Sequence, residues 1–142
     1  MSDGNMVFVH TQRDFQRALK REPEGAVVVL NADRTYVVPV VQRSTPFPEV
    51  IVRGEATLIG GRHPLRVTVL DGGEVSVENV AFVRADTNRC VNVADTPGVT
   101  ILAASTASVR NCETVVVNKG ISLAAYGCDQ VIIEEKSNET DA

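Results

Sequence analysis

The sequence predicts an all-β fold: a single-stranded parallel β-helix, or solenoid, with about 16 residues per coil and one capping α-helix near the N-terminus. The first observation behind this prediction is a strict repeat. Every eighth residue from Val67 to Val131 is aliphatic, and so is the residue two places after each of them, up to Ile133. Alternate residues of a strand point to the same face, so each unit is a short apolar–variable–apolar strand followed by a turn. A fixed period kept without insertion from residue 67 to residue 133 indicates a repeat architecture.

The turns are the second observation, because two turn chemistries alternate along the repeat. In every second unit, the fourth residue after the aliphatic anchor is of a type that tolerates a left-handed backbone or caps its own turn. These residues are Asn79, Asp95, Asn111 and Gly127. In the other units, the fifth residue after the anchor is Gly72, Asn88, Ala104 or Gly120. Each chemistry recurs every 16 residues, as a coil with two sides and two corners requires, whereas a meander of hairpins gives no such alternation.

Composition is the third observation, and it also limits the function. The chain has 142 residues, enough for one domain with a core, and 44% of them are hydrophobic. Aromatic residues make up 4%, which suits a narrow interior of stacked Val, Ile and Ala. A net charge of −4 argues against a nucleic-acid partner. Without a long apolar run or a signal-peptide pattern, the sequence predicts no membrane partner and a cytoplasmic location.

The residues before the regular repeat predict a cap for the first coil. A short strand is expected at Met6–His10 and a helix at Thr11–Arg21. Thr11 is a favourable N-cap, with the acidic Asp14 three residues later. Helical spacing gives one apolar stripe, formed by Phe15, Ala18 and Leu19. Because the open end of a solenoid exposes strand edges, we expect this helix to cover the first layer.

The rest of the single domain, which spans residues 1–142, divides into three stretches. These are residues 26–66 with irregular first coils, residues 67–133 with the regular coils, and residues 134–142 as a polar tail. Within the first coils, strands are expected at Ala26–Leu30 and Thr35–Val41. A cap comparable to the helix is not expected after Ile133, so either the tail or another subunit covers that end.

Stacking of the coils predicts ladders of equivalent side chains. The inward ladders are Val67, Val83, Val99, Val115 and Val131 on one side, and Val75, Val91, Ala107 and Leu123 on the other. One corner position is occupied in turn by Val80, Thr96, Cys112 and Cys128. We therefore expect Cys112 to stack on Cys128. Together with Cys90, these cysteines form neither an even disulfide set nor a metal-binding spacing, which predicts free thiols.

The residues from His10 to Val38 carry a first family resemblance. They contain Phe15 and Ala18 in the helix, followed by Glu24-Gly25, Val27–Leu30 and Thr35-Tyr36. This order resembles the entry segment of pectate-lyase-like right-handed β-helix proteins, in which a helix precedes a short strand and a Gly-Thr-Tyr-type turn into the coils. Here Asp33-Arg34-Thr35-Tyr36 takes that place without the glycine. The resemblance implies a right-handed coil, a point that the repeat itself leaves open.

A second resemblance covers roughly the last third of the chain. It is carried by the segment Ser122–Cys128 together with Thr100-Ile101-Leu102 and Ser108-Val109-Arg110. These residues resemble the eight-residue Val-x-Ala-Tyr-Gly repeats of small solenoid proteins in actinobacteria and their phages. The resemblance implies the architecture and a phage setting, with the protein associated with the virion. It implies no activity.

Catalytic and metal-binding patterns are not evident in the sequence. β-Helix enzymes that cleave polysaccharides need carboxylates that face each other across a groove. The candidate acids are Asp71, Glu78, Asp86, Asp95 and Glu113. No Asp-Asp pair occurs among them, and the two histidines, His10 and His63, have no nearby cysteine partner. We therefore expect no metal, no cofactor and no enzymatic activity.

The outward residues between the anchors are the candidates for binding. On one side they are Ser76, Asn92, Ser108 and Ala124, and on the other side they are Thr68, Arg84, Thr100, Val116 and Ile132. The second side becomes apolar toward the C-terminus. Val116 and Ile132, with Ala124 on the opposing side, are therefore the expected contact residues for another subunit or a partner.

The sequence leaves the function open between two main hypotheses. The first is a non-enzymatic β-solenoid that acts as a structural or binding module, forms a homo-oligomer and contacts a protein partner. The alternative is a shortened carbohydrate-binding or carbohydrate-cleaving β-helix protein, because a flat ladder of small polar residues suits a glycan. An acidic rod that mimics DNA is a weaker third idea, because the net charge is small and Arg84 and Arg110 interrupt the acidic faces.

Overall fold

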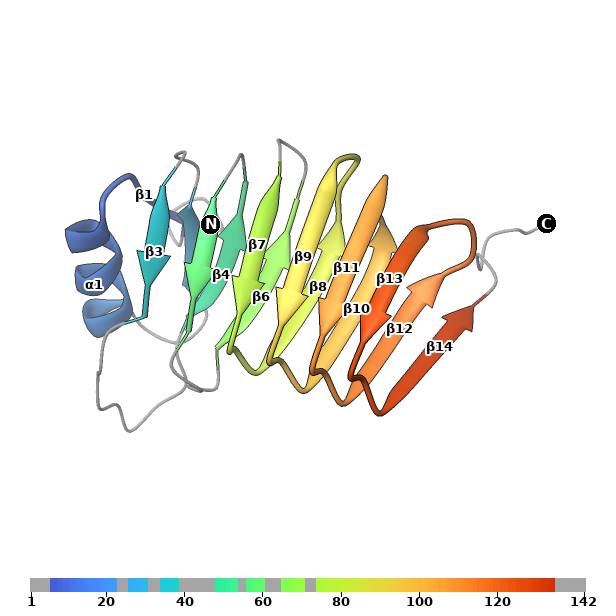
Figure 1. The fold of residues 1–142 in the computed structure, drawn as a ribbon. Coiled ribbons are helices and arrows are strands. Elements are labelled where there is room, and N and C mark those ends of the chain that lie inside the picture. The colour runs from blue at the N-terminus through green and yellow to red at the C-terminus, as the bar shows by residue number, and fades with distance from the viewer. Residues whose placement is uncertain are drawn as a thin grey trace.

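The computed structural model describes residues 6–22, 26–30, 34–38, 48–53, 56–60, 65–70 and 74–134. Within these residues the chain winds as a parallel β-solenoid, with one short helix, α1 (Gln12–Arg21), at its N-terminal end (Figure 1). After α1, the strands belong alternately to two sheets that face each other across the core. Neighbouring strands within each sheet run parallel. This arrangement confirms the predicted fold class.

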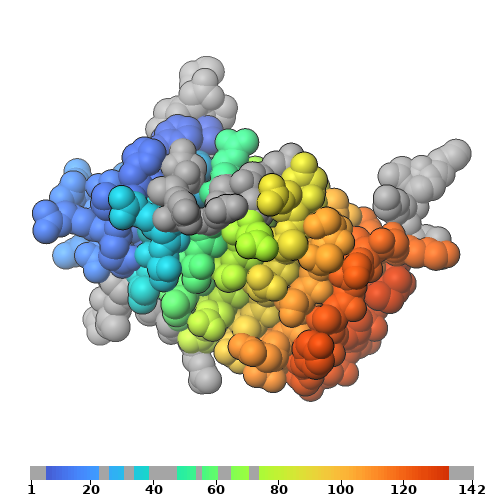
Figure 2. Space-filling view, turned by 45° about the horizontal axis from the view of Figure 1, so that its top comes forward, coloured from blue at the N-terminus to red at the C-terminus, as the bar shows by residue number. Residues whose placement is uncertain are grey.

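In the described part of the chain, the two sheets, called A and B, have eight and six strands respectively. Sheet A consists of β1 (Met6–Val9), β2 (Val27–Leu30), β4 (Glu49–Val52), β6 (Arg66–Val69), β8 (Phe82–Asp86), β10 (Gly98–Ala103), β12 (Thr114–Asn118) and β14 (Gln130–Glu134). Sheet B consists of β3 (Thr35–Val37), β5 (Thr57–Ile59), β7 (Val75–Glu78), β9 (Cys90–Ala94), β11 (Thr106–Arg110) and β13 (Ser122–Tyr126). From β6 onward, successive strands of sheet A begin 16 residues apart. Figure 2 shows this order at the surface as successive bands of colour from blue to red.

Strand register stacks the aliphatic anchors as predicted. In sheet A, Val83 pairs with Val99 and Val99 pairs with Val115, and all three side chains are buried. In sheet B the same stacking joins Val75, Val91 and Ala107. Removing one Val or Leu side chain fully from water stabilises the fold by about 1.5–3 kcal/mol. The repeated ladders are therefore the main source of stability.

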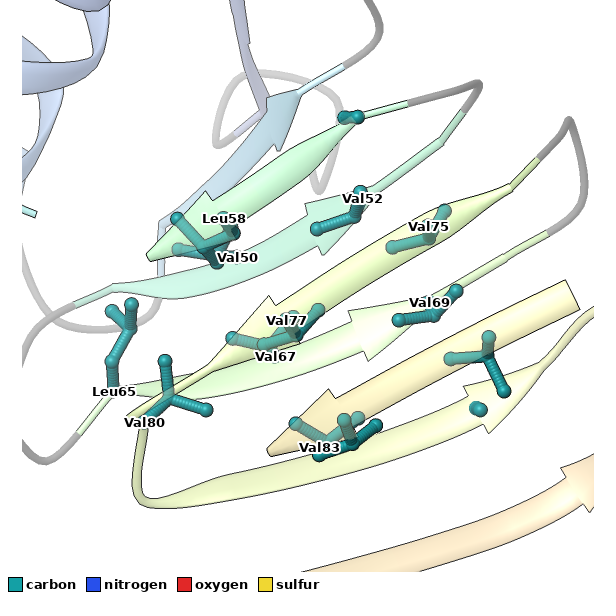
Figure 3. Close-up of a cluster of buried hydrophobic side chains, with 14 of the residues drawn as sticks. Val50, Val52, Leu58, Leu65, Val67, Val69, Val75, Val77, Val80 and Val83 are labelled. Carbon is teal, nitrogen blue, oxygen red and sulfur yellow. The ribbon is translucent and has the colours of Figure 1, made fainter. Parts of the chain in front are cut away.

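Side chains from the two sheets meet in one narrow core. Figure 3 shows Val50 and Val67 of sheet A beside Leu58 and Val77 of sheet B, with the side chains between the two layers. All four are buried. The fully buried aromatic residues of the described chain, Phe15 and Tyr36, lie instead at the N-terminal end, so the interior of the regular coils consists mainly of small aliphatic groups.

The N-terminal strands and helix are of the predicted types, but some of their boundaries differ from the predicted ones. Strand β1 stops at Val9, one residue before the expected end at His10. Helix α1 begins after the predicted N-cap Thr11, whose Oγ1 accepts a hydrogen bond from the Asp14 amide at 3.0 Å. Strand β3 ends at Val37, although the sequence predicted a strand as far as residue 41, and residues 39–41 lie outside the described chain. The expected polar tail beyond residue 134 also lies outside it.

The left-handed corners occur where the turn chemistry predicts them. The φ angles of Asn79, Asp95, Asn111 and Gly127 are 63°, 54°, 57° and 66°. Among residues that carry a side chain, Asn and Asp adopt this conformation most readily, because their short polar side chains can form local hydrogen bonds. Asn111 Nδ2 also donates a hydrogen bond to Asp95 Oδ1 at 3.3 Å, one coil away. These corners therefore turn the chain and also connect adjacent coils.

Shortening an inward side chain should destabilise the solenoid strongly. Ile101 is fully buried in β10, so Ile101→Ala is expected to lower the free energy of unfolding by about 2–5 kcal/mol. The matched control is Thr100→Ala on the outward face of the same strand, with an expected change within about 0.5 kcal/mol. Urea denaturation followed by circular dichroism measures both, and equal losses in the two variants would contradict the assigned faces.

The corner at Asn111 offers a test of backbone conformation. Asn111→Ala should lower the free energy of unfolding by about 1–2 kcal/mol, because alanine is disfavoured at positive φ. Asn111→Gly removes the same side-chain hydrogen bond without that steric cost, so its loss should be smaller. Chemical denaturation of both variants separates the two contributions. Similar losses would show that the hydrogen bond to Asp95, rather than the backbone, decides the corner.

Candidate functional site

The last coil presents the most unusual surface of the described chain. Strands β13 and β14 are the final strands of sheets B and A, and among the described residues neither has a neighbouring strand on its outer side. We call this surface the C-terminal end, formed by the inward-register residues Leu123, Ala125, Val131 and Ile133. Val131 is 38% exposed and Ile133 is 57% exposed, although the equivalent Val115 and Val117 one coil earlier are buried.

The exposure of Val131 is a departure from the predicted inward ladder. Val131 keeps the register of that ladder, because it pairs with Val115 in the neighbouring strand. Its side chain is nevertheless accessible, because no described residue lies beyond β14 to form the next layer. The C-terminal end therefore combines apolar side chains with a strand edge, and strand edges carry backbone groups able to pair with another strand.

The three contact residues expected from the sequence lie around this end. Val116 and Ile132 are register partners in β12 and β14, so they lie side by side on the outer face of sheet A. Ile132 is 36% exposed and Val116 is half-buried. Ala124 lies in β13 of sheet B, so the structure does not bring it next to the other two. A contact made by any of the three stays a prediction.

Helix α1 makes the N-terminal end different. Phe15 and Leu19 of the helix are fully buried, and the Phe15 ring meets the Tyr36 ring edge-on with centroids 5.5 Å apart. The Gln12 side chain reaches the backbone of Val37 in β3: Nε2 donates to the Val37 carbonyl at 2.6 Å, and Oε1 accepts from the Val37 amide at 2.8 Å. Gln12 thus takes the hydrogen-bonding place that a further strand would occupy.

A shallow groove runs over the outer face of sheet B. Its volume is about 390 Å³, and its lining includes residues from β5, β7, β9, β11 and β13. Strand register aligns two columns of outward residues in it. One column is Thr57, Ser76, Asn92, Ser108, and the other is Glu78, Ala94, Arg110, Tyr126. The first column contains Ser76, Asn92 and Ser108 of the outward ladder expected from the sequence, together with Thr57 and without the expected Ala124.

The second column was missed because sequence reasoning followed only the residue between each pair of anchors. Glu78, Arg110 and Tyr126 line the groove, and the small Ala94 lies between Glu78 and Arg110 in register. Tyr126 is 62% exposed, so its side chain is accessible to a ligand. The 16-residue spacing of these positions would have revealed the column. The groove therefore combines hydroxyl, amide, charged and aromatic groups.

The candidate acids do not converge on one point. Glu78 lines the groove, whereas Asp86 and Glu113 are exposed outside its lining. Asp95 occupies a left-handed corner and accepts the hydrogen bond from Asn111. Asp71 lies outside the described residues. In the groove, Glu78 is thus the acid that could take part in chemistry, and its column places it two strands from Arg110.

The corner ladder containing two cysteines is confirmed. Thr96 Oγ1, Cys112 Sγ and Cys128 Sγ each donate a hydrogen bond to the carbonyl two residues earlier, at 3.0, 3.4 and 3.6 Å. The Asp129 amide donates to the Cys112 carbonyl at 3.1 Å, which fixes Cys128 beside Cys112 in the next coil. The pKa of the Cys112 thiol is raised, mainly by burial and also by the adjacent Cys128 thiol. A backbone hydrogen bond from Thr96 lowers this pKa, but burial has the larger effect.

Two further features concern ligands and membranes. In the described part of the chain, no group of three or more His, Cys, Asp or Glu side chains is placed to hold a metal ion. His10 is exposed, and His63 lies outside the described residues. Helix α1, the helix in the described part of the chain, is too short to cross a lipid bilayer. Cys90, Cys112 and Cys128 are all free thiols.

Comparison with known proteins gives no relative: no family model matches the chain, and neither curated proteins nor solved structures match it. The fold class, a parallel β-solenoid with a helix at its N-terminal end, is therefore assigned from the geometry of this chain itself.

Proposed function

We propose that this protein is a non-enzymatic β-solenoid module that associates with itself through its C-terminal end. The observation that carries the proposal is the exposure of Val131 and Ile133 at positions that are buried in every preceding regular coil. Covering apolar surface contributes about 25 cal/mol for each Å² removed from water. A second copy would supply both this cover and a strand for the edge of β14.

The contrast between the two ends supports the same proposal. At the N-terminal end, Phe15 and Leu19 cover the core and Gln12 fills the edge of β3. The described residues contain no corresponding helix or side-chain clamp over β13 and β14. A phage or virion-associated setting, as implied by the repeat resemblance, is part of this proposal. It rests on those repeat residues alone.

Self-association can be measured directly in solution. Size-exclusion chromatography with light scattering should give a mass above the 15.3 kDa of one chain for the wild type. Ile133→Glu should shift the protein to the monomer, because a charge would be buried in the joint without a partner. The matched control is Phe8→Glu, which changes an exposed residue (54%) of β1 and should leave the mass unchanged.

Circular dichroism of both variants must first show an intact fold. Ile133 is more than half exposed in the single chain, so its replacement is compatible with folding. A wild-type protein that stays monomeric at millimolar concentration would contradict the proposal.

A second candidate function, carbohydrate binding, is favoured by the groove on sheet B. Its polar column provides hydroxyl and amide groups at the spacing of the strands, about 4.8 Å. Tyr126 provides an exposed ring at one end, and Glu78 and Arg110 in the same column provide charged hydrogen-bonding groups. These are the groups that a chain of sugar hydroxyls requires. The scattered candidate acids favour binding over cleavage.

A glycan array followed by calorimetry with the best oligosaccharide tests this candidate. Tyr126→Ala should weaken binding about fivefold, because stacking on one aromatic ring contributes on the order of 1 kcal/mol. Arg84→Ala, on the outer face of sheet A, is the control and should bind like the wild type. Release of reducing sugars that stops in Glu78→Gln would favour cleavage instead. An array without any binding would remove this candidate.

A further inference from the structure

We infer that two copies join β14 to β14 in antiparallel orientation across a two-fold axis that passes close to Ile132, and that the assembly closes at two copies. This inference rests on the proposed self-association and specifies its geometry. Three features carry it: the different construction of the two ends, the order of residues in β14, and the position of β14 along the solenoid.

The N-terminal end limits how copies can join. A head-to-tail stack would place β13 and β14 of one copy over β1 and β3 of the next. Helix α1 lies over that end (Figure 1). The Gln12 side chain already makes both backbone hydrogen bonds with Val37. The joint must therefore form between two C-terminal ends. Two like ends meet through a two-fold axis, and such an interface is closed rather than propagating.

A two-fold axis perpendicular to both the solenoid and its strands reverses the direction of each strand and sets sheet A of one copy beside sheet A of the other. The strands inside one copy are all parallel within their sheets, but the strands at the joint run antiparallel. Among the described residues β14 is the last strand, half a coil beyond β13. It therefore reaches the partner first, and we assign the direct strand pairing to β14 alone.

The sequence of β14 is complementary to itself in this orientation. With Ile132 opposite Ile132 of the second copy, Val131 lies opposite Ile133, so apolar residues face each other on the core side. On the outer face, the Gln130 amide lies opposite the Glu134 carboxylate, and these two groups can share a hydrogen bond. Within the five residues of β14, no pair in this register sets like charges against each other.

Other registers are less favourable. A shift of one residue sets a core-side residue opposite an outward residue and so mismatches the two faces. A shift of two residues sets Ile132 opposite either Glu134 or Gln130, which removes an apolar contact from the joint. In the centred register, Val116 and Ile132 of both copies also form one continuous apolar strip across the outer face of sheet A. That strip contains two of the three contact residues predicted from the sequence.

Cysteine cross-linking tests the geometry. The background protein carries Cys90→Ser, Cys112→Thr and Cys128→Thr. Threonine already occupies this corner at Thr96, and hydroxyl residues Thr106 and Ser122 share the column of Cys90. Ile132→Cys is then oxidised with diamide. Because opposed residues of antiparallel strands have Cα atoms about 4.5–5.5 Å apart, an intermolecular disulfide should form in most of the protein.

The matched control is Val116→Cys, one strand back in the same column. Its two copies would lie three strand spacings apart, about 14 Å, which is beyond the reach of a disulfide. As a second check, Gln130→Cys and Glu134→Cys should cross-link with each other when the two variants are mixed. Each variant alone should not cross-link, because the two identical cysteines of its dimer would lie at opposite ends of the strand pair.

The outcomes separate this inference from the proposal on which it rests. A mass of two chains with cross-linking at Ile132→Cys and none at Val116→Cys supports both. A dimer without cross-linking at Ile132→Cys, or oligomers that grow with concentration, overturns the geometry and leaves self-association standing. A monomeric protein would mean that residues 135–142 or a different molecule covers the C-terminal end, and it would overturn both.

Discussion

Parallel hydrogen bonding between strands one coil apart forces every coil of this solenoid to repeat the width and register of its neighbours. The anchors Val83, Val99 and Val115 can stack only because each strand of sheet A meets the next without a shift at these positions. A larger side chain in one layer would separate the sheets there and disturb the layers on both sides. The low aromatic content and the preference for Val, Ile and Ala follow from this constraint.

The same constraint governs the corners. A chain that must return to the same axial line after each side needs a sharp reversal at the same place in every coil. Asn79, Asp95 and Asn111 provide it with positive φ angles, and Gly127 provides it without a side chain. A Cβ at Gly127 would lie 2.7 Å from Asn111 Oδ1, so a larger residue there would require the Asn111 side chain to move and would also adopt a strained positive φ. The type of turn residue and the strand register thus both follow from the winding of the chain into coils of equal shape.

Much of the fold could be predicted from the sequence because both consequences are periodic. The stacked cysteines, the left-handed corners and the N-cap of the helix all followed from local residue types and fixed spacing. The hydrogen bonds of Gln12 with Val37 could not be predicted, because they join residues 25 apart through an irregular region. The exposure of Val131 and Ile133 depends on what lies beyond the last layer, and a repeat pattern describes only what precedes it. The column from Glu78 to Tyr126 could also have been predicted, because its residues follow the same 16-residue spacing.

The separation between a specialised first layer and uniform later layers has a consequence for how such a molecule can change in size. Helix α1 contacts β1, β2 and β3, and β14 presents its edge whatever the number of coils between them. Each regular coil contacts mainly the coil before and the coil after it, as in other solenoids. Adding or removing a block of 16 residues would therefore lengthen or shorten the rod by about 4.8 Å and leave both termini chemically the same. The number of coils, and with it the length of the rod, can therefore change without altering the surfaces at its two ends.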